Sequence, residues 1–135
     1  MKLKRITTYL LLTLCILCGS CRRASDNGKI DGYWKIYDIY YTADGTTSNP
    51  EDEFISIQLE LLQLQNPLPS PQLTGVLSYK KGDDTLGVDF RNNPSDEILY
   101  DFGFIGPQCV LHIDRVDGSN LVLSSPIARI TCKKY

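Results

Sequence analysis

The chain has 135 residues with 14 Lys or Arg, 16 Asp or Glu and one His, and its formal net charge is −2. Residues 21–135 carry 14 − 3 = 11 basic and 16 acidic side chains, a net charge of −5, which argues against a nucleic-acid partner because its phosphates would be repelled. Without residues 1–20 the chain still has 135 − 20 = 115 residues, enough for one domain with one modest hydrophobic core.

Residues 1–20 have the pattern of a signal peptide. A basic start is followed by an apolar run of twelve residues from Ile6 to Leu17. As a helix this run would rise about 18 Å, well short of the roughly 30 Å hydrocarbon core of a bilayer. A secretory segment therefore fits better than a transmembrane span.

Cys21 is the expected attachment point to a membrane. Residues 18–20 (Cys-Gly-Ser) are small and precede Cys21 directly, and this stretch resembles a bacterial lipobox, except that Cys18 stands where leucine is usual. The resemblance implies cleavage before Cys21 and acylation of its thiol. Arg22 follows, where an aspartate would indicate retention at the inner membrane, so we expect an outer-membrane lipoprotein that faces the periplasm or the cell surface. An ordinary signal peptide cleaved elsewhere and an uncleaved anchor are the alternatives.

Residues 21–29 are polar and without periodicity, which predicts a tether, and residues 30–135 form the predicted domain. Short apolar or alternating runs closed by turn residues predict eight strands in that domain. They cover residues 32–41, 54–64, 73–80, 85–90, 98–105, 109–114, 121–124 and 127–134.

The run 54–64 is ambiguous. Its isoleucines and leucines alternate with polar residues, as in a strand, but its polar residues also recur at helical spacing after a helix-start pattern at 49–53. We favour a strand because no other stretch of the domain predicts a helix of comparable length.

Short connections between the strands force antiparallel neighbours, because parallel crossovers have no room. Eight sequential antiparallel strands close on themselves without leaving exposed edges. We therefore expect an all-β fold, a single up-and-down antiparallel eight-stranded barrel, with a two-sheet β-sandwich as the alternative.

A family resemblance rests on both ends of the domain. Gly32-Tyr33-Trp34 resembles the Gly-x-Trp start of lipocalins, and residues 121–125 and 130–135 resemble the closing hairpin of lipocalin-like lipoproteins of Gram-negative bacteria. The resemblance extends over residues 32–135 and implies a calycin-like barrel, often with no assigned ligand. The chain departs from the pattern in being shorter than a typical lipocalin and in showing no clear helix after the barrel strands.

Catalytic and metal-binding signatures are not found, so we expect no enzyme, no metal and no cofactor. His112 lies on the strand face opposite its apolar neighbours and has no nucleophile motif beside it. Cys109 and Cys132 both face inward, but the strand 121–124 lies between the two strands that carry them. Two inter-strand steps place the two cysteines about 9–10 Å apart laterally, beyond the roughly 7 Å limit between bridged Cα atoms. We expect two buried thiols, with a disulfide as the alternative. The inward thiols and the outward His112 do not converge on zinc, and the acidic runs 51–53 and 83–84 lack a calcium-loop pattern.

Tyrosines crowd the first predicted strand. A tyrosine joins a flat apolar ring to a hydroxyl, which suits sugars and amphiphilic ligands, although cross-strand packing is the commoner use. Trp34 is favoured as a plug for one barrel end. The candidate ligand contacts are Trp34, Ile36, Tyr40, Tyr79, Tyr100 and Phe102.

Two functions follow. In the first, a lipid-anchored cell-envelope lipoprotein binds a small apolar or amphiphilic ligand without catalysis, and residues 42–53 cover the mouth of the barrel. In the second, the barrel is filled by its own side chains, and exposed tyrosines contact envelope proteins or glycans. The interior of an eight-stranded barrel is just wide enough to hold one small ligand or to be filled by the barrel's own side chains.

Overall fold

The computed structural model of the chain describes residues 2–9, 27–66 and 73–135. Residues 2–9 are helical, and no helix within these three ranges is long and apolar enough to cross a membrane. Cys21 and most of the predicted signal peptide and tether lie outside the described residues, so cleavage and lipidation stay predictions.

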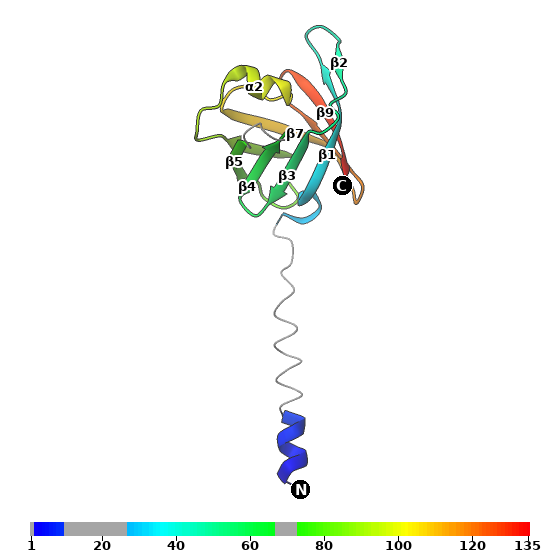
Figure 1. Ribbon diagram of the computed structural model, residues 1–135, viewed down its shortest axis with the longest axis vertical. Coiled ribbons are helices and arrows are strands. Elements are labelled where there is room, and N and C mark those ends of the chain that lie inside the picture. The colour runs from blue at the N-terminus through cyan, green and yellow to red at the C-terminus, as the bar shows by residue number, and fades with distance from the viewer. Residues whose placement is uncertain (1, 10–26, 67–72) are drawn as a thin grey trace.

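The described part of the domain is one antiparallel sheet of nine strands (Figure 1). The elements are η1 (Gly28–Ile30), β1 (Gly32–Tyr41), β2 (Thr47–Ser48), β3 (Phe54–Gln58), β4 (Leu61–Gln65), β5 (Leu73–Ser78), β6 (Thr85–Asp89), α2 (Asp96–Asp101), β7 (Gln108–Val116), β8 (Asn120–Ser124) and β9 (Ala128–Lys134). The strand order is β2-β1-β3-β4-β5-β6-β7-β8-β9, and β1 also pairs with β9.

The pairing of β1 with β9 closes the sheet into a barrel. It runs from Trp34 opposite Lys134 to Tyr41 opposite Ala128, with one bulge between Ile36 and Asp38. Strand β2 is an extra two-residue strand that pairs with the upper part of β1 and belongs to the hairpin leading to β3. The other eight strands form the predicted up-and-down eight-stranded barrel, which the structure confirms over the sandwich.

Residues 54–64 are β-structure, as predicted, but they form a hairpin of two strands and not one long strand. Strands β3 and β4 pair from Phe54 opposite Gln65 to Gln58 opposite Leu61. Leu59 adopts a positive φ of 54°, which allows the chain to reverse at Leu59–Glu60. The sequence has no glycine, asparagine or proline at this turn, so the usual turn signal is missing.

The predicted strand 98–105 is also wrong, because residues 96–101 form the short helix α2. Ser95 caps this helix by accepting a hydrogen bond from the Ile98 amide, and Asp96 and Glu97 lie in its first turn, where acidic side chains favour the helix dipole. The loop after α2 places Phe102 and Phe104 in the core. Pro94-Ser95-Asp96-Glu97 is therefore a helix start. The apolar run that follows it was interpreted as a strand.

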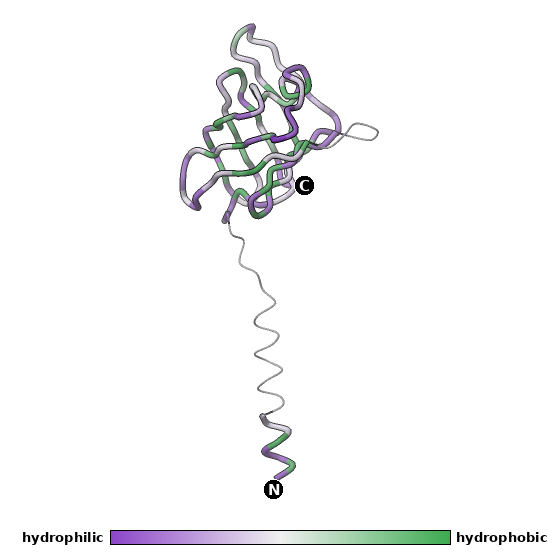
Figure 2. The backbone as a smooth tube through the Cα atoms, turned by 90° about the vertical axis from the view of Figure 1, so that its left-hand side faces the viewer, coloured by the Kyte–Doolittle hydropathy of each residue, from purple (hydrophilic) through white to green (hydrophobic). Residues whose placement is uncertain are grey.

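The core lies inside the barrel and is built by strand alternation. Figure 2 shows hydrophobic and hydrophilic positions following one another along the strands. The inward positions carry bulky side chains, and Trp34, Phe90 and Phe104 are the largest of those under 2% exposed. Gly75 makes room for this packing, since a Cβ there would lie 2.4 Å from Val88 Cγ1. Burial of these apolar surfaces stabilises the closed sheet.

Candidate functional site

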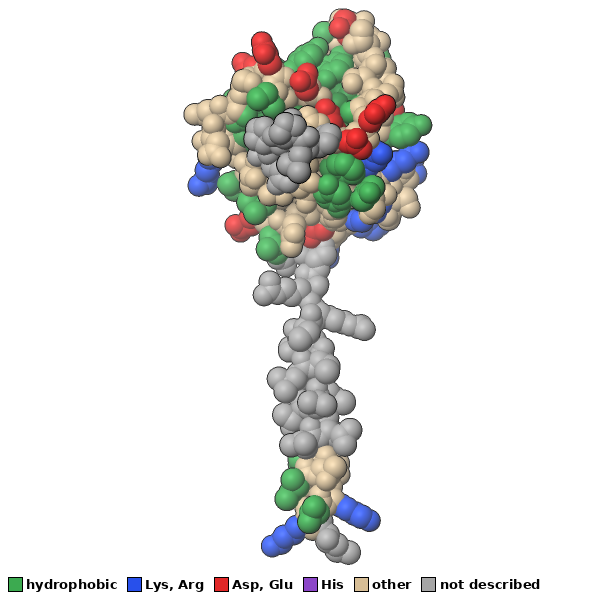
Figure 3. Space-filling view, in the orientation of Figure 1, with side chains coloured by type: hydrophobic (Ala, Val, Ile, Leu, Met, Phe, Trp, Pro, Cys, Tyr) green, Lys and Arg blue, Asp and Glu red, His purple; other side chains and the backbone are tan. Residues whose placement is uncertain are grey.

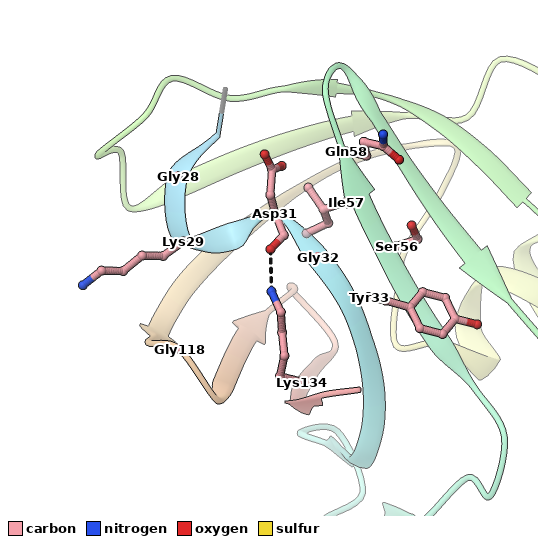
Figure 4. A pocket seen from close by; sticks show the side chains of 10 residues that line it. All are labelled: Gly28, Lys29, Asp31, Gly32, Tyr33, Ser56, Ile57, Gln58, Gly118 and Lys134. Atoms are coloured by element: carbon pink, nitrogen blue, oxygen red, sulfur yellow. Dashed lines mark hydrogen bonds between the residues drawn. The ribbon is translucent and has the colours of Figure 1, made fainter. Parts of the chain in front are cut away.

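A groove of about 520 Å³ lies at the lower end of β1, beside the point where the described domain begins (Figure 4). We call it the lower groove. It is open to solvent and is lined by Gly28, Lys29, Asp31, Gly32, Tyr33, Ser56, Ile57, Gln58, Gly118 and Lys134. In Figure 4 the ring of Tyr33 extends toward β3, whereas Lys29 extends from η1 to the other side.

At the lower groove, Lys134 joins segments that are distant along the chain through one hydrogen bond and one cation–π contact. Lys134 Nζ donates to the Asp31 carbonyl oxygen at 2.7 Å and lies 4.6 Å from the centroid of the Trp34 ring. Gly32 has a φ of 147°, and a Cβ at this position would lie 2.1 Å from Lys134 Nζ. Glycine is therefore needed where β1 begins, because the lysine crosses directly over the backbone.

An aromatic cluster continues the lower groove onto the outer surface of the barrel. The rings of Tyr33 and Phe54 are stacked with centroids 4.8 Å apart, and Tyr135 meets both edge-on at 5.6 and 5.1 Å. The Tyr33 hydroxyl donates to Gln65 Oε1 at 2.7 Å, which fixes the ring. Residues of three strands and the segment after β9 thus build one aromatic surface, which hydrogen bonding and ring packing hold rigid.

Further up β1, aromatic rings alternate with basic side chains. Lys133 Nζ lies 4.2 Å from the Tyr37 ring centroid, and Arg129 Cζ lies 5.8 Å from that of Tyr40. Lys35 stands opposite Lys133 in the β1–β9 ladder. Together with the aromatic cluster these five residues form what we call the aromatic–basic face. Figure 3 shows hydrophobic side chains beside Lys and Arg on the side of the barrel that carries β1.

The opposite, upper end of the barrel is acidic. Its carboxylates lie on the segment 42–53 and on α2, namely Asp44, Glu51, Asp52, Glu53, Asp96, Glu97 and Asp101. The Tyr41 hydroxyl donates to the Tyr100 carbonyl oxygen at 2.7 Å, and the two rings stack at 4.7 Å. Burial first, then the negative groups near it, raises the pKa of Tyr41 to about 12. The end of β1 and α2 are therefore joined by Tyr41 and Tyr100.

Glu53 is the unusual carboxylate at this end. Its Oε2 atom is buried and has no hydrogen-bond partner among the described residues. Burial, with a contribution from Asp101, raises the pKa of Glu53 to about 7. No group of three or more His, Cys, Asp or Glu side chains in the described ranges could hold a metal ion.

The six predicted ligand contacts are not brought together by the structure. Trp34, Ile36 and Phe102 are buried in the core, where the Trp34 Nε1 donates to the Ile30 carbonyl oxygen at 2.9 Å. Tyr40 points outward on β1, and Tyr79 is half-buried and accepts a hydrogen bond from the Gly82 amide. Tyr100 is 46% exposed on α2 and lines a shallow pocket there with three acidic neighbours.

The histidine and cysteines lie where the alternation predicts them. His112 is exposed, with Nδ1 2.7 Å from Asp114 Oδ1. Cys109 and Cys132 are buried with free thiols, on β7 and β9, and β8 lies between those strands. Burial first, and then Asp38, raises the pKa of the Cys132 thiol to about 12, so the buried sulfur stays protonated at neutral pH.

Most of the lower groove and the basic half of the aromatic–basic face were not predicted from the sequence. Ser56, Gln58 and Lys134 are ordinary polar residues of strands, and only the pairing of β1 with β3 and β9 brings them together. One signal was available: Tyr33, Lys35 and Tyr37 alternate with the buried core residues of β1 and so share its outer side.

Comparisons with known proteins agree with this architecture. A family model described as a lipocalin-like domain matches residues 14–135. A lipocalin-like protein from Bacteroides uniformis ATCC 8492 is similar in structure, with 20% identity, a TM-score of 0.65 and a match over 80% of this chain and 100% of that one. An uncharacterized protein from Bacteroides eggerthii DSM 20697 is 17% identical, with a TM-score of 0.60 and coverage of 78% and 98%. No curated protein matches the chain. Since the family model spans most of its length and the closed barrel has the corresponding fold, the chain belongs to the lipocalin-like domain family.

Proposed function

We propose that this protein is a lipid-anchored lipoprotein of the outer membrane, attached through Cys21, and that its lipocalin-like domain is a non-catalytic binding module of the cell envelope. The lipobox-like stretch before Cys21 supports the anchor, and the seven residues from Cys21 to Asn27, six residue-to-residue steps, would span about 20 Å if extended. The outer surface of the barrel then lies within reach of envelope components.

The observation that carries the proposal is the contrast between the inside and the outside of the barrel. Inward positions are occupied by large apolar side chains that belong to one hydrophobic cluster. The outside presents a groove and exposed rings instead, with Tyr37 at 55% and Tyr135 at 76% exposed. A binding surface built this way contacts its ligand outside the barrel, which favours the interaction function over a ligand held in the interior.

The lower groove has the chemistry of a site for hydroxyl-rich ligands. Tyr33 supplies a ring at one wall, while Ser56 and Gln58 supply a hydroxyl and an amide beside it on the outer side of β3. Such groups donate and accept hydrogen bonds, and a ring packs against the apolar side of a sugar. We propose that a glycan, or the polar head of an amphiphile, binds here.

The anchor is tested by the intact mass of the protein purified from envelope membranes. We expect a chain that begins at Cys21 and carries acyl groups. Cys21→Ala should yield no acylated product, whereas the control Cys18→Ala should be processed normally, since it keeps a small residue before the cleavage site. An unmodified thiol at Cys21 in the wild-type protein would refute the anchor.

The binding site is tested by titrating the protein with oligosaccharides and following amide NMR signals. We expect shifts at the lower groove that Gln58→Ala weakens about three- to tenfold, the effect of losing one or two hydrogen bonds. Gln108→Ala removes an exposed amide from β7 and serves as the control. Shifts confined to the upper end, or equal effects of both variants, would contradict this placement.

A small apolar ligand inside the barrel is the second location to test, because three predicted contacts, Trp34, Ile36 and Phe102, point into the core. Such a ligand would have to displace packed side chains. Mass spectrometry of organic extracts from the purified protein measures this directly. A stoichiometric apolar molecule would move the binding site from the outside to the interior.

A further inference from the structure

We propose that the aromatic–basic face binds an acidic polysaccharide, a linear chain of sugars that carry carboxylate or phosphate groups. This inference rests on the proposed function, since it names the class of ligand that a binding module acting through its outer surface would take. The face consists of Tyr33, Tyr37, Tyr40, Phe54 and Tyr135 with Lys35, Arg129 and Lys133.

The cations of this face are available to an anionic ligand. In the described part of the chain, none of Lys35, Arg129 and Lys133 forms a salt bridge. The positive charge of Arg129 also acts at longer range on Asp114. Partial burial acts to raise the pKa of Asp114, but its hydrogen bonds to Ser124 and His112 and, to a smaller extent, the charge of Arg129 lower it below its usual value. Contact with the rings of Tyr37 and Tyr40 holds two of the cations in place, so that less side-chain freedom is lost on binding.

Charged side chains are unevenly distributed over the domain, and their distribution favours this face. The chain from residue 21 onward is acidic overall, but seven of its sixteen carboxylates lie on the segment 42–53 and α2, whereas β1 and β9 carry only one, the half-buried Asp38. Figure 3 shows Asp and Glu side chains around that upper end. An anionic ligand is thus repelled from the upper end and attracted to the side of β1 and β9, because local potentials guide binding more than the net charge does.

The shape of the face fits an extended polymer. Its residues follow β1 and β9 in a strip from Tyr135 and Tyr33 at the lower end to Tyr40 at the upper end. At about 3.3 Å per residue, Tyr33 and Tyr40 lie about 23 Å apart along the strand, the length of several sugar rings. The exposed rings offer apolar surfaces for the sugars, and the cations between them match acidic substituents at intervals.

Polygalacturonate is a direct probe, because every sugar carries a carboxylate, and its methyl ester has the same backbone without the charge. We expect the full-length protein to bind polygalacturonate at least tenfold more tightly than the ester in calorimetric titrations, and this difference to shrink as salt is added. Equal affinity for both polymers would overturn the acidic-ligand inference while leaving glycan binding intact. Binding of neither, with no response to any oligosaccharide at the lower groove, would count against the proposed function itself.

The position of the site is tested by two charge-matched variants. Lys35→Gln/Arg129→Gln/Lys133→Gln should weaken polygalacturonate binding by about tenfold or more, the combined effect of three exposed ion pairs. The control variant changes three exposed cations elsewhere, Lys80, Lys81 and Arg91, to Gln, and should bind within about twofold of the wild type. Equal losses would show that only net charge matters and would overturn the assignment to this face.

Experiments with the same protein also test two other possible partners of this face, a second copy of the chain and an anionic membrane. A second copy of the chain would give a concentration-dependent dimer in sedimentation that the triple variant abolishes. Anionic vesicles of phosphatidylglycerol, compared with neutral phosphatidylcholine, would protect Tyr37 and Tyr40 from hydroxyl-radical labelling in the absence of polysaccharide. Either result, without polygalacturonate binding, would overturn the proposal.

Discussion

Replacing Glu53 by glutamine should make the stability of the domain less sensitive to a rise in pH from about 4.5 to about 7. The Glu53 backbone carbonyl accepts a hydrogen bond from the Ile36 amide, which fixes the residue at the start of β3. Its side chain is half-buried, with Oε2 unpartnered within the described residues and Asp101 as a further negative neighbour. Glutamine keeps the shape of the side chain and removes the charge.

The size and direction of the effect follow from the pKa of Glu53, which rises from 4.5 to about 7 on folding. Between these values the folded state holds a proton that the unfolded state has released, so the free energy of unfolding falls as the pH rises through this range. A shift of this size corresponds to about 3 kcal/mol at full effect, and the partial exposure of the side chain reduces it to about 1–2 kcal/mol.

Urea unfolding at pH 4 and pH 8 measures the effect. We expect Glu53→Gln to be about 1–2 kcal/mol more stable than the wild type at pH 8 and nearly equal to it at pH 4. Glu51→Gln makes the same chemical change at an exposed neighbour and should alter neither value by more than about 0.5 kcal/mol. A Glu53→Gln variant that keeps the pH dependence of the wild type would refute the reasoning.

Two further predictions concern the barrel core. Gly75→Ala should lower the free energy of unfolding by about 1–3 kcal/mol, because its Cβ would lie 2.4 Å from Val88 Cγ1, whereas Gly87→Ala, with its nearest contact at 3.6 Å, should change it by less than about 0.5 kcal/mol. Equal losses in urea unfolding would contradict this packing. Trp34→Phe should cost about 1–3 kcal/mol in thermal unfolding, because it removes the hydrogen bond to the Ile30 carbonyl oxygen and leaves a cavity, and an unchanged melting temperature would show that Trp34 contributes little.

The number of barrel strands was predicted correctly although two of the predicted strands were wrong. Residues 54–64 give two strands instead of one, and residues 98–105 give a helix and a loop instead of a strand. The hairpin reverses at Leu59, a residue type that seldom adopts a positive φ, so local turn chemistry does not reveal it. The helix was readable from Ser95, Asp96 and Glu97, but an apolar run of helix residues and core residues imitates a strand.

Local alternation predicted which side each residue faces, but it did not predict which residues meet. The inward positions of Cys109 and Cys132 and the outward position of His112 follow from period-two spacing alone. The lower groove depends on contacts between η1, β3 and the end of β9, which lie far apart along the chain. Such contacts are set by the register of the closed barrel, which no local pattern specifies.

The pairing of the first and last barrel strands has a consequence for biogenesis. Trp34 cannot pair with Lys134 until about a hundred intervening residues have been synthesised. Until then β1 has an open edge, available to any neighbouring chain. The barrel therefore closes only when β9 is present, and polypeptides truncated before that strand are expected to be substrates for chaperones and proteases.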